Sequence, residues 1–395
     1  MLLISTKALK PGMTLAQPIF HPLSDSCILL TKGVELKSRY ITRLHELEVG
    51  HVWIEFPGLE DVDRSVNEAI SADHARLYDV INNSVNRLER RVAVKINLHY
   101  YRKAVRCMLA DIVDDADHEV MTHQLACCGS AITGHLANTC YLALLVGAHL
   151  TGYVRRQRSA LPANVAENTS ELGVGALLHD IGKLQMPDEL QTKSILDAES
   201  DWPEYRYHVR TGYDHAREHI SVVAANILLN HHQRYDGSGF PPRETRHRDR
   251  APAPPAGRQI HIFSRIVGVV DAFDHLLSPK RRSVPTVVAI HGLKSAQLAG
   301  WFDPVVVETL LRLLPPFQVG SVVTLSNGSE AVVVENHPEA PCRPRVRLMG
   351  GSMNDSTACV TSRLLDLRMC RDIMIAAVDG VDVRDYIFTG ELEPV

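Results

Sequence analysis

The sequence predicts a mainly α-helical protein with a small α/β module at its N-terminus and a small β domain at its C-terminus. Mostly apolar helical segments fill the middle of the chain, alternating β-branched runs follow Pro316, and the first 58 residues mix strand and helix patterns. A chain of 395 residues has room for two or three domains. We divide it into an α/β module (1–58), a helical connector (59–120), a helical domain (121–316) and a β domain (317–395).

Residues 1–58 predict strands around one helix. "CILLTKGVEL" predicts a strand, a turn at Lys32-Gly33 and a second short strand. "SRYITRLHELEVG" places apolar residues on one helix face, with Gly50 where a C-terminal cap belongs. "HVWIEF" then alternates as a strand does. In the connector, "HARLYDVINNSVNRLERRVAV" is helical and charged, and its heptads are too few to choose between a connector and a dimerising helix.

The middle region consists of helices that are apolar on most faces, such as "HLANTCYLALLVGAHL" and "FSRIVGVVDAFDHLL". Polar side chains in such helices need partners or ligands. "RRQRSALPANVAENTS" and "RETRHRDRAPAPPAG" interrupt the helices and predict loops, the second exposed. Asp303 before Pro304 predicts a helix start, and "LLPP" predicts its end.

The last region has a strand pattern throughout. "GSVVTLSNGSEAVVVEN" is two β-branched runs joined by Asn-Gly, which is typical of a hairpin, and "RPRVRLM" and "IMIAAV" continue the pattern. No residue in this domain suggests chemistry.

Composition excludes several classes of protein. A net charge of -4 gives no reason to expect a nucleic-acid polymer or a membrane surface as partner, and no apolar run approaches the ~20 residues that span a bilayer. The N-terminus lacks the pattern of a signal peptide, so we expect a cytoplasmic protein. None of the eight cysteines forms a C-x-x-C pair, so we interpret them as small buried hydrophobic residues.

The helical region carries histidines and aspartates in or beside its apolar segments. Each buried polar group without a partner would cost on the order of 1–3 kcal/mol, and a metal centre would satisfy them together. The candidate ligands are His135, His179, Asp180, His208, His231, His232 and Asp271.

These residue types narrow the choice of metal ion. Imidazoles with carboxylates and no thiolate suit iron, manganese, nickel or zinc in a hydrolytic site. Neighbours on a helix point about 100° apart, so His179 and Asp180 predict a two-metal centre bridged by the aspartate rather than one small ion. Lys183 follows one turn later, where it could neutralise phosphate charge or face solvent.

The stretch "NHHQRYDGSGFPP" would end a helix with two ligands and close it with a rigid turn. Asp236 would cap this turn or orient a ligand. Phe240 would either stack on a base or pack.

Four segments resemble the HD-GYP family of HD-domain metal-dependent phosphohydrolases. "LLHDIGKLQMPDEL" is similar to its HD-G-K segment, "HHQRYDGSGFP" to HHE-x-x-D-G-S-G-Y-P, and "SRIVGVVDAFDHLLS" to R-I-x-x-x-x-D-x-F-D-A-L, while "HLANTCYLALLVG" matches the helix of the first ligand. The resemblance covers roughly residues 121–315. "LKPGMTLAQPIF" also resembles a module found ahead of such domains.

The resemblance implies an all-helical HD-type catalytic domain that hydrolyses cyclic di-GMP to pGpG or GMP through a metal-bridged hydroxide. It implies the same seven metal ligands, with Asp180 bridging and catalytic, and Lys183 as the catalytic phosphate contact. The candidate substrate-binding residues are Lys183, Arg234, Asp236, Phe240, Lys280 and Arg281.

The chain departs from the family pattern at several positions. Phe240 stands where the family has tyrosine, and Gln233 where it has glutamate. Ala131 occupies the place of a glutamate in three-metal relatives, so we predict two divalent transition metal ions, iron or manganese first, with zinc and nickel as the alternatives. "SPKRRSVP" keeps charge at Lys280, Arg281 and Arg282 without the family's R-P-Y-R-K-like pattern. An insertion of about ten residues follows Pro242.

Two other functions stay open. The chain could be a cyclic dinucleotide receptor or interaction module with weak or no turnover, or a phosphohydrolase of another nucleotide. We expect cyclic di-GMP as substrate, a diguanylate cyclase-type or other signalling protein as a partner, and no nucleic-acid polymer or membrane. The charged helices before residue 120 are compatible with a homodimer.

Overall fold

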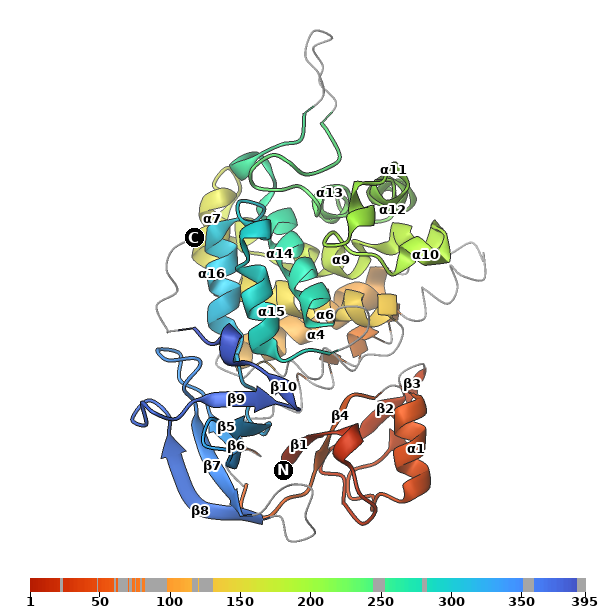
Figure 1. Cartoon of the computed structure of the whole chain (residues 1–395). Helices are drawn as coiled ribbons and strands as arrows, with labels where there is room; N and C mark the ends of the chain where they lie inside the picture. The colour runs from red at the N-terminus through yellow and green to blue at the C-terminus, as the bar shows by residue number, and fades with distance from the viewer. Residues whose placement is uncertain are drawn as a thin grey trace.

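The structure is a computed structural model of the chain (Figure 1). It describes residues 1–21, 24–47, 49–59, 62, 70, 73–74, 76–78, 80–81, 98–115, 120, 131–243, 253–278, 283–350 and 359–388. The α-helices are α1 (Ser38–Glu46), α4 (Leu98–Asp114), α6 (Ala131–His149), α7 (Thr151–Gln157), α8 (Ala163–Ala166), α9 (Ser170–Leu178), α10 (Asp188–Gln191), α11 (Pro203–Arg206), α12 (His208–Ala216), α13 (Val222–Asn230), α14 (Ile262–Leu277), α15 (Thr286–Leu293) and α16 (Pro304–Leu313). The strands are β1 (Leu2–Ser5), β2 (Ile19–His21), β3 (Ser24–Leu30), β4 (His51–Ile54), β5 (Val322–Leu325), β6 (Glu330–Glu335), β7 (Arg345–Gly350), β8 (Cys359–Asp366), β9 (Ile375–Val378) and β10 (Val381–Asp382).

The middle of the chain is helical, as predicted. Helix α6 packs against α9 and α14, and α9 also packs against α13, around one apolar core. Glycines permit the close approach of α9, because a Cβ at Gly175 would lie 2.4 Å from Ile227 Cδ1 and one at Gly173 would lie 2.6 Å from Val105 Cγ1. This tight bundle fixes the backbone positions from which the polar side chains project.

The C-terminal region forms an antiparallel sheet, in the order β10-β9-β5-β6-β7-β8 over the residues described there. The predicted hairpin is β5 and β6, with Gly328 at a φ of 81° in the turn that joins them. Asp303 caps α16 through a hydrogen bond from Val305 N, and Pro304 is the first residue of that helix, also as predicted.

The N-terminal module does not stand alone. Strand β1 pairs with β4, and Leu3 N donates to Gly320 O at 2.9 Å, so the module is joined to the start of the C-terminal sheet. One apolar core runs through both regions, and a Cβ at Gly320 would lie 2.5 Å from the ring of Trp53. Figure 1 shows the module and the sheet side by side below the helices. The two ends of the chain therefore build one packed unit.

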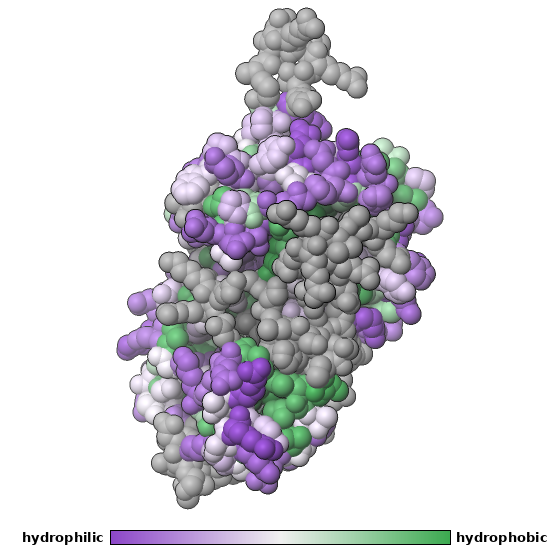
Figure 2. Space-filling view, turned by 90° about the vertical axis from the view of Figure 1, so that its right-hand side faces the viewer, coloured by the Kyte–Doolittle hydropathy of each residue, from purple (hydrophilic) through white to green (hydrophobic). Residues whose placement is uncertain are grey.

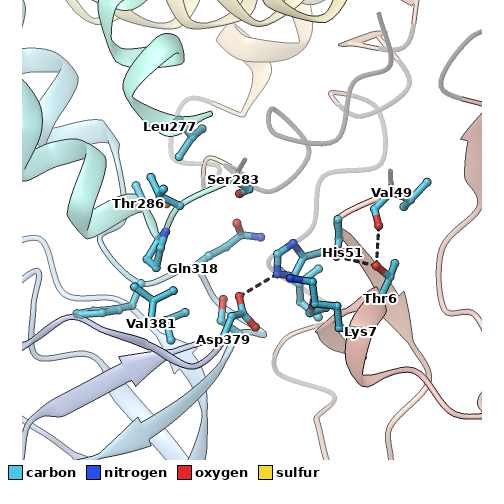
Figure 3. Close-up of a pocket in the computed structure, with 18 of the residues that line it drawn as sticks. Thr6, Lys7, Val49, His51, Leu277, Ser283, Thr286, Gln318, Asp379 and Val381 are labelled. Atoms are coloured by element: carbon cyan, nitrogen blue, oxygen red, sulfur yellow. Dashed lines mark hydrogen bonds and ion pairs between the residues drawn. The ribbon is translucent and has the colours of Figure 1, made fainter. Parts of the chain in front are cut away.

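A cavity of about 780 Å³ lies where this unit meets the helical region (Figure 3). Its lining includes Lys7 from the module, Thr286 from α15 and Gln318 from the segment before β5. His51 Nε2 donates a hydrogen bond to Asp379 Oδ2 at 2.8 Å across it. This pair adds a polar link between the module and the sheet.

Some local predictions were wrong. The helix α1 ends at Glu46 rather than at Gly50, because the Gly50 carbonyl accepts a hydrogen bond from Thr6 N beside β1. The first predicted loop contains the short helix α8. Residues 244–252 of the second loop, and most of the connector before α4, lie outside the described residues.

The four cysteines whose state the structure gives, Cys107, Cys140, Cys342 and Cys370, carry free thiols. Figure 2 shows hydrophilic residues over most of the coloured surface of one face, with hydrophobic ones gathered in its lower part. Among the described helices, none combines the length and apolar character needed to cross a bilayer.

Candidate metal centre

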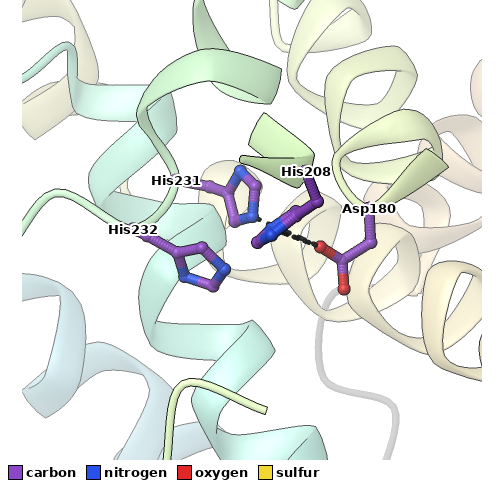
Figure 4. A group of neighbouring side chains, drawn as sticks. All are labelled: Asp180, His208, His231 and His232. Atoms are coloured by element: carbon purple, nitrogen blue, oxygen red, sulfur yellow. Dashed lines mark ion pairs between the residues drawn. The ribbon is translucent and has the colours of Figure 1, made fainter. Parts of the chain in front are cut away.

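The structure brings all seven candidate ligands to one place in the helical bundle. They fall into two groups whose potential ligand atoms lie within 4.8 Å of one another. One group is Asp180, His208, His231 and His232, and the other is His135, His179, Asp180 and Asp271. Figure 4 shows the first group, with the three rings and the carboxylate pointing toward one another.

Helix ends supply most of these residues. His179 follows the last residue of α9, Asp180 begins the 3-10 turn that comes next, and His208 begins α12. His231 caps the C-terminus of α13, and His232 follows it. Asp180 enters both groups and His179 only one, which is compatible with the expected arrangement of an aspartate shared by two ions and a histidine on one side.

Asp180 belongs to both groups because its two oxygens face opposite ways. Its Oδ1 lies 3.2 Å from His208 Nε2 and 3.5 Å from His231 Nε2. Its Oδ2 lies 3.6 Å from Nε2 of both His135 and His179. A carboxylate placed in this way has the geometry of a bridge between two cations.

Asp271, in the middle of α14, has a similar arrangement. Its Oδ1 lies 3.2 Å from His135 Nε2 and 3.8 Å from His179 Nε2. Its Oδ2 lies 3.8 Å from His232 Nδ1, which belongs to the other group. Both carboxylates are about 1% exposed.

Backbone carbonyls orient three of the imidazoles. Nδ1 of His179 lies 2.8 Å from Ala176 O, Nδ1 of His208 lies 2.5 Å from Tyr205 O, and Nδ1 of His231 lies 3.1 Å from Leu228 O. A carbonyl can only accept, so each Nδ1 donates its proton and each neutral ring keeps the Nε2 lone pair for a ligand.

These inward atoms fit a bound metal. Within the described residues, Nε2 of His208, His231 and His232 and both oxygens of Asp180 and Asp271 are buried and have no hydrogen-bond partner. Buried polar atoms normally have a hydrogen-bond partner, and a buried polar atom without one costs about 1–3 kcal/mol of stability. Imidazole and carboxylate donors without a thiolate suit a divalent transition metal.

A chain of hydrogen bonds behind His135 escaped the sequence analysis. His135 Nδ1 donates to Asp274 Oδ2 at 2.8 Å, and Asn138 Nδ2 donates to Asp274 Oδ1 at 2.7 Å. His74 Nε2 lies 3.0 Å from Asn138 Oδ1. The sequence did contain a signal for Asp274, because it is an acidic residue in an apolar helix, one turn after Asp271. Such partners fix the ring and its tautomer.

The electrostatics favour cation binding at neutral pH. Burial opposes charge on Asp180, but Lys183 and His179 hold its pKa well below the usual value. Burial lowers the pKa of His231 to about 4, so this ring is neutral and able to ligate. Burial also opposes charge on His135, but Asp271 and Asp274 outweigh it and raise the pKa of this ring to about 10. Metal binding at His135 would therefore displace a proton.

Lys183 lies beside the centre, although α9 does not continue to it as an α-helix. It is on the 3-10 turn Ile181–Gln185, 2% exposed, with Nζ 2.5 Å from Asp180 Oδ2 and 3.0 Å from Lys193 O. The solvent-facing alternative is wrong, because Lys183 is buried and its ammonium forms an ion pair with the Asp180 carboxylate.

The other predicted substrate contacts are more dispersed. Asp236 is exposed and accepts a hydrogen bond from Ser238 N at 2.8 Å, which is the predicted capping of its turn. Phe240 is 3% exposed, with its ring centroid 5.0 Å from that of His232, so it packs against the centre. The Arg234 guanidinium stacks on Trp301 at 3.2 Å. Lys280 and Arg281 lie outside the described residues.

Comparisons with known proteins agree with this site. Residues 132–306 match the family model of the HD domain, and residues 322–383 match that of the KOW domain associated with the HD domain. The first match contains all seven residues of the centre.

Curated relatives match less than half of this chain. The cyclic di-GMP phosphodiesterase PA4108 of Pseudomonas aeruginosa is 29% identical over 182 residues, which is 45% of this chain and 41% of the relative. The cyclic di-GMP phosphodiesterase response regulator RpfG of Xanthomonas campestris pv. campestris is 32% identical over 169 residues, which is 42% of this chain and 41% of the relative. The 3'3'-cGAMP-specific phosphodiesterase 2 of Vibrio cholerae is 31% identical over 170 residues, or 42% and 28%.

The chain thus spans about two fifths of the length of the first two relatives. The matches confirm the resemblance drawn from the motifs. Residues 132–306 are an HD domain by this match, and residues 322–383 match the KOW domain associated with it.

Proposed function

We propose that this protein is a metal-dependent phosphodiesterase that hydrolyses cyclic di-GMP to pGpG, GMP or both. The observation that carries the proposal is the position of Asp180, whose two oxygens face separate groups of imidazoles. The names of the relatives supply the substrate class. We further propose two ions, iron or manganese, in a cytoplasmic signalling enzyme.

The chain's own residues have distinct tasks in this proposal. Asp180 and Asp271 would hold both ions, and the five histidines would complete the two coordination shells. Two divalent cations about 3.5–4 Å apart lower the pKa of water and polarise a phosphoryl oxygen. Lys183 would hold Asp180 in its bridging orientation and place positive charge next to the scissile phosphate.

Burial supports the same reaction. His179 is 0% and His208 1% exposed, and Phe240 covers His232. Excluding bulk water strengthens the interaction of these charges with a phosphate and protects the nucleophile from competing protonation. Arg234, Lys280 and Arg281 are proposed to hold the rest of the dinucleotide.

The first test is turnover with Asp180→Ala. Protein purified without oxygen and loaded with Fe(II) or Mn(II) is incubated with cyclic di-GMP and, separately, with 3'3'-cGAMP, and products are separated by chromatography. We expect pGpG or GMP from the wild type. We expect Asp180→Ala to lose at least about 100-fold in rate and most of its metal, because both groups lose a shared ligand.

Asp214→Ala, which removes an exposed carboxylate on α12, is the matched control and should keep full activity. Binding of cyclic di-GMP without product would identify a receptor instead. Turnover of 3'3'-cGAMP but not of cyclic di-GMP would show that the substrate is 3'3'-cGAMP. Full activity in the Asp180→Ala variant would contradict the proposed two-metal site in which Asp180 bridges the ions.

A further inference from the structure

His275 is an extra imidazole at the metal centre. It lies on α14, one turn after Asp271, and it was absent from the seven candidates. In the family segment R-I-x-x-x-x-D-x-F-D-A-L its place is alanine, whereas this chain reads "RIVGVVDAFDHL". The family motif therefore assigns no role to His275, and any role must be inferred from where the side chain lies.

The ring of His275 approaches the centre closely. Its Nε2 lies 3.4 Å from Asp271 Oδ1, the oxygen that His135 Nε2 approaches to 3.2 Å. The rings of His275 and His135 are stacked, with centroids 4.4 Å apart and planes at 28°. Two nearly parallel imidazoles therefore direct their Nε2 atoms at one carboxylate oxygen.

The contact with Asp271 is not a hydrogen bond. His275 Nε2 is buried and has no hydrogen-bond partner among the described residues, and neither does Asp271 Oδ1. His208 and His231 have the same relation to Asp180 Oδ1, at 3.2 and 3.5 Å. In each case a nitrogen and an oxygen are close without a hydrogen bond between them, as two ligand atoms of one ion would be.

The separation fits a shared cation. Ligand bonds from imidazole nitrogen or carboxylate oxygen are about 2.0–2.2 Å, so neighbouring ligands of one ion lie roughly 3.0–3.5 Å apart. The 3.4 Å between His275 Nε2 and Asp271 Oδ1 lies in this range. The His275 side chain is 21% exposed, but its Nε2 is buried, and an imidazole that merely packed would leave this atom unsatisfied at a cost of about 1–3 kcal/mol.

We propose that His275 Nε2 is an additional metal ligand, which binds the same divalent cation as Asp271 Oδ1. This inference rests on the proposed function, because it requires the metal centre to be loaded. It adds a nitrogen donor on the His135 side of the centre.

Metal titration tests the proposal without relying on activity. Metal-free wild type, His275→Ala, His275→Gln and His219→Ala are titrated with Mn(II), and free Mn(II) is measured by electron paramagnetic resonance. We expect both His275 variants to bind one equivalent about tenfold or more weakly, and to lose one imidazole nitrogen coupling in the bound spectrum. His219→Ala, which removes an exposed histidine, should match the wild type.

His275→Gln separates a ligand from a positioning residue. The glutamine amide keeps a hydrogen-bond donor for Asp271 but offers no imidazole nitrogen, so recovery of wild-type affinity and spectrum in this variant would overturn the proposal. Unchanged Mn(II) binding in His275→Ala would do the same. Should His275→Ala fail to fold, as judged by circular dichroism, the glutamine variant decides. A wild type that binds no Mn(II) would defeat the proposed function itself, which is a different result.

Discussion

At the scale of single residues, the centre depends on how each imidazole is held. Three rings donate Nδ1 to backbone carbonyls, so the helix ends themselves orient them. His135 differs, because its Nδ1 donates to the carboxylate of Asp274, which Asn138 holds in turn. A side-chain partner can be removed by mutation, and a backbone partner cannot.

We therefore expect Asp274→Ala to weaken metal binding by about 10–100-fold. The ring of His135 would lose its orienting acceptor and part of the charge that raises its pKa. Metal content after dialysis against a graded chelator would measure the loss. Asp372→Ala, at an exposed position of the C-terminal region, serves as control. Equal metal retention in the two variants would show that Asp274 does not orient His135.

At the scale of elements, α14 carries both Asp271 and Asp274, so its N-terminus matters to the site. His261 is the N-cap, and its Nδ1 accepts a hydrogen bond from Phe263 N at 3.2 Å. Burial, followed by the charges of Arg158 and Arg265, lowers the pKa of His261 to about 4. A protonated ring could not accept this bond.

The sign of the pH effect follows from that shift. His261 has a pKa near 6.5 in the unfolded chain and about 4 in the folded one, so between these values the unfolded chain binds more protons. The stability that neutral His261 contributes to the fold is therefore complete above pH 6.5 and is lost as the pH falls toward 4. At pH 5 the loss is on the order of 1–2 kcal/mol. His261→Asn keeps a capping oxygen without the titration.

We expect the variant to lose less stability than the wild type between pH 7.5 and pH 5. Urea unfolding midpoints of metal-free protein at the two pH values would measure this. Other buried histidines contribute equally to both proteins, so the difference isolates His261. The same pH-dependent loss in both would refute the capping role.

At the scale of the whole molecule, the two ends of the chain share one core and meet the helical region at a common junction. Trp53 of the N-terminal module is 4% exposed and packs on Gly320, at the entry to the C-terminal sheet. From the sheet's far end, Phe388 packs near Lys294, which follows α15, and Tyr386 near His291 of α15. The C-terminal region is therefore tied to both the module and the helical region.

We expect Trp53→Ala to destabilise the module and the sheet together, by about 3–5 kcal/mol. Hydrogen exchange at the amides of β1, β4, β5 and β6 would report on each part. Trp202→Ala, which removes an indole that is 51% exposed, is the matched control. Loss of protection confined to β1 and β4 would show that the shared core does not couple the two parts.

Local patterns in the sequence determined much of this molecule. Apolar periodicity predicted the helical region, the Asn-Gly turn predicted the hairpin of β5 and β6, and Asp303-Pro304 predicted the start of α16, because each depends on residues close together in the chain. Histidines and aspartates in apolar helices pointed to the seven residues that meet at the centre, since buried polar groups require partners wherever they lie.

Tertiary structure alone decided what depends on distant contacts. Asp236 and Asp274 are both acids near the motifs, yet one is exposed on a turn and the other lies behind His135. Gly50 looked like a helix cap until the pairing of β1 with β4 fixed its carbonyl. The joining of the two chain ends, and the approach of His275 to Asp271, arise from packing between separate elements. Periodicity along one segment carries no information about which other segment will face it.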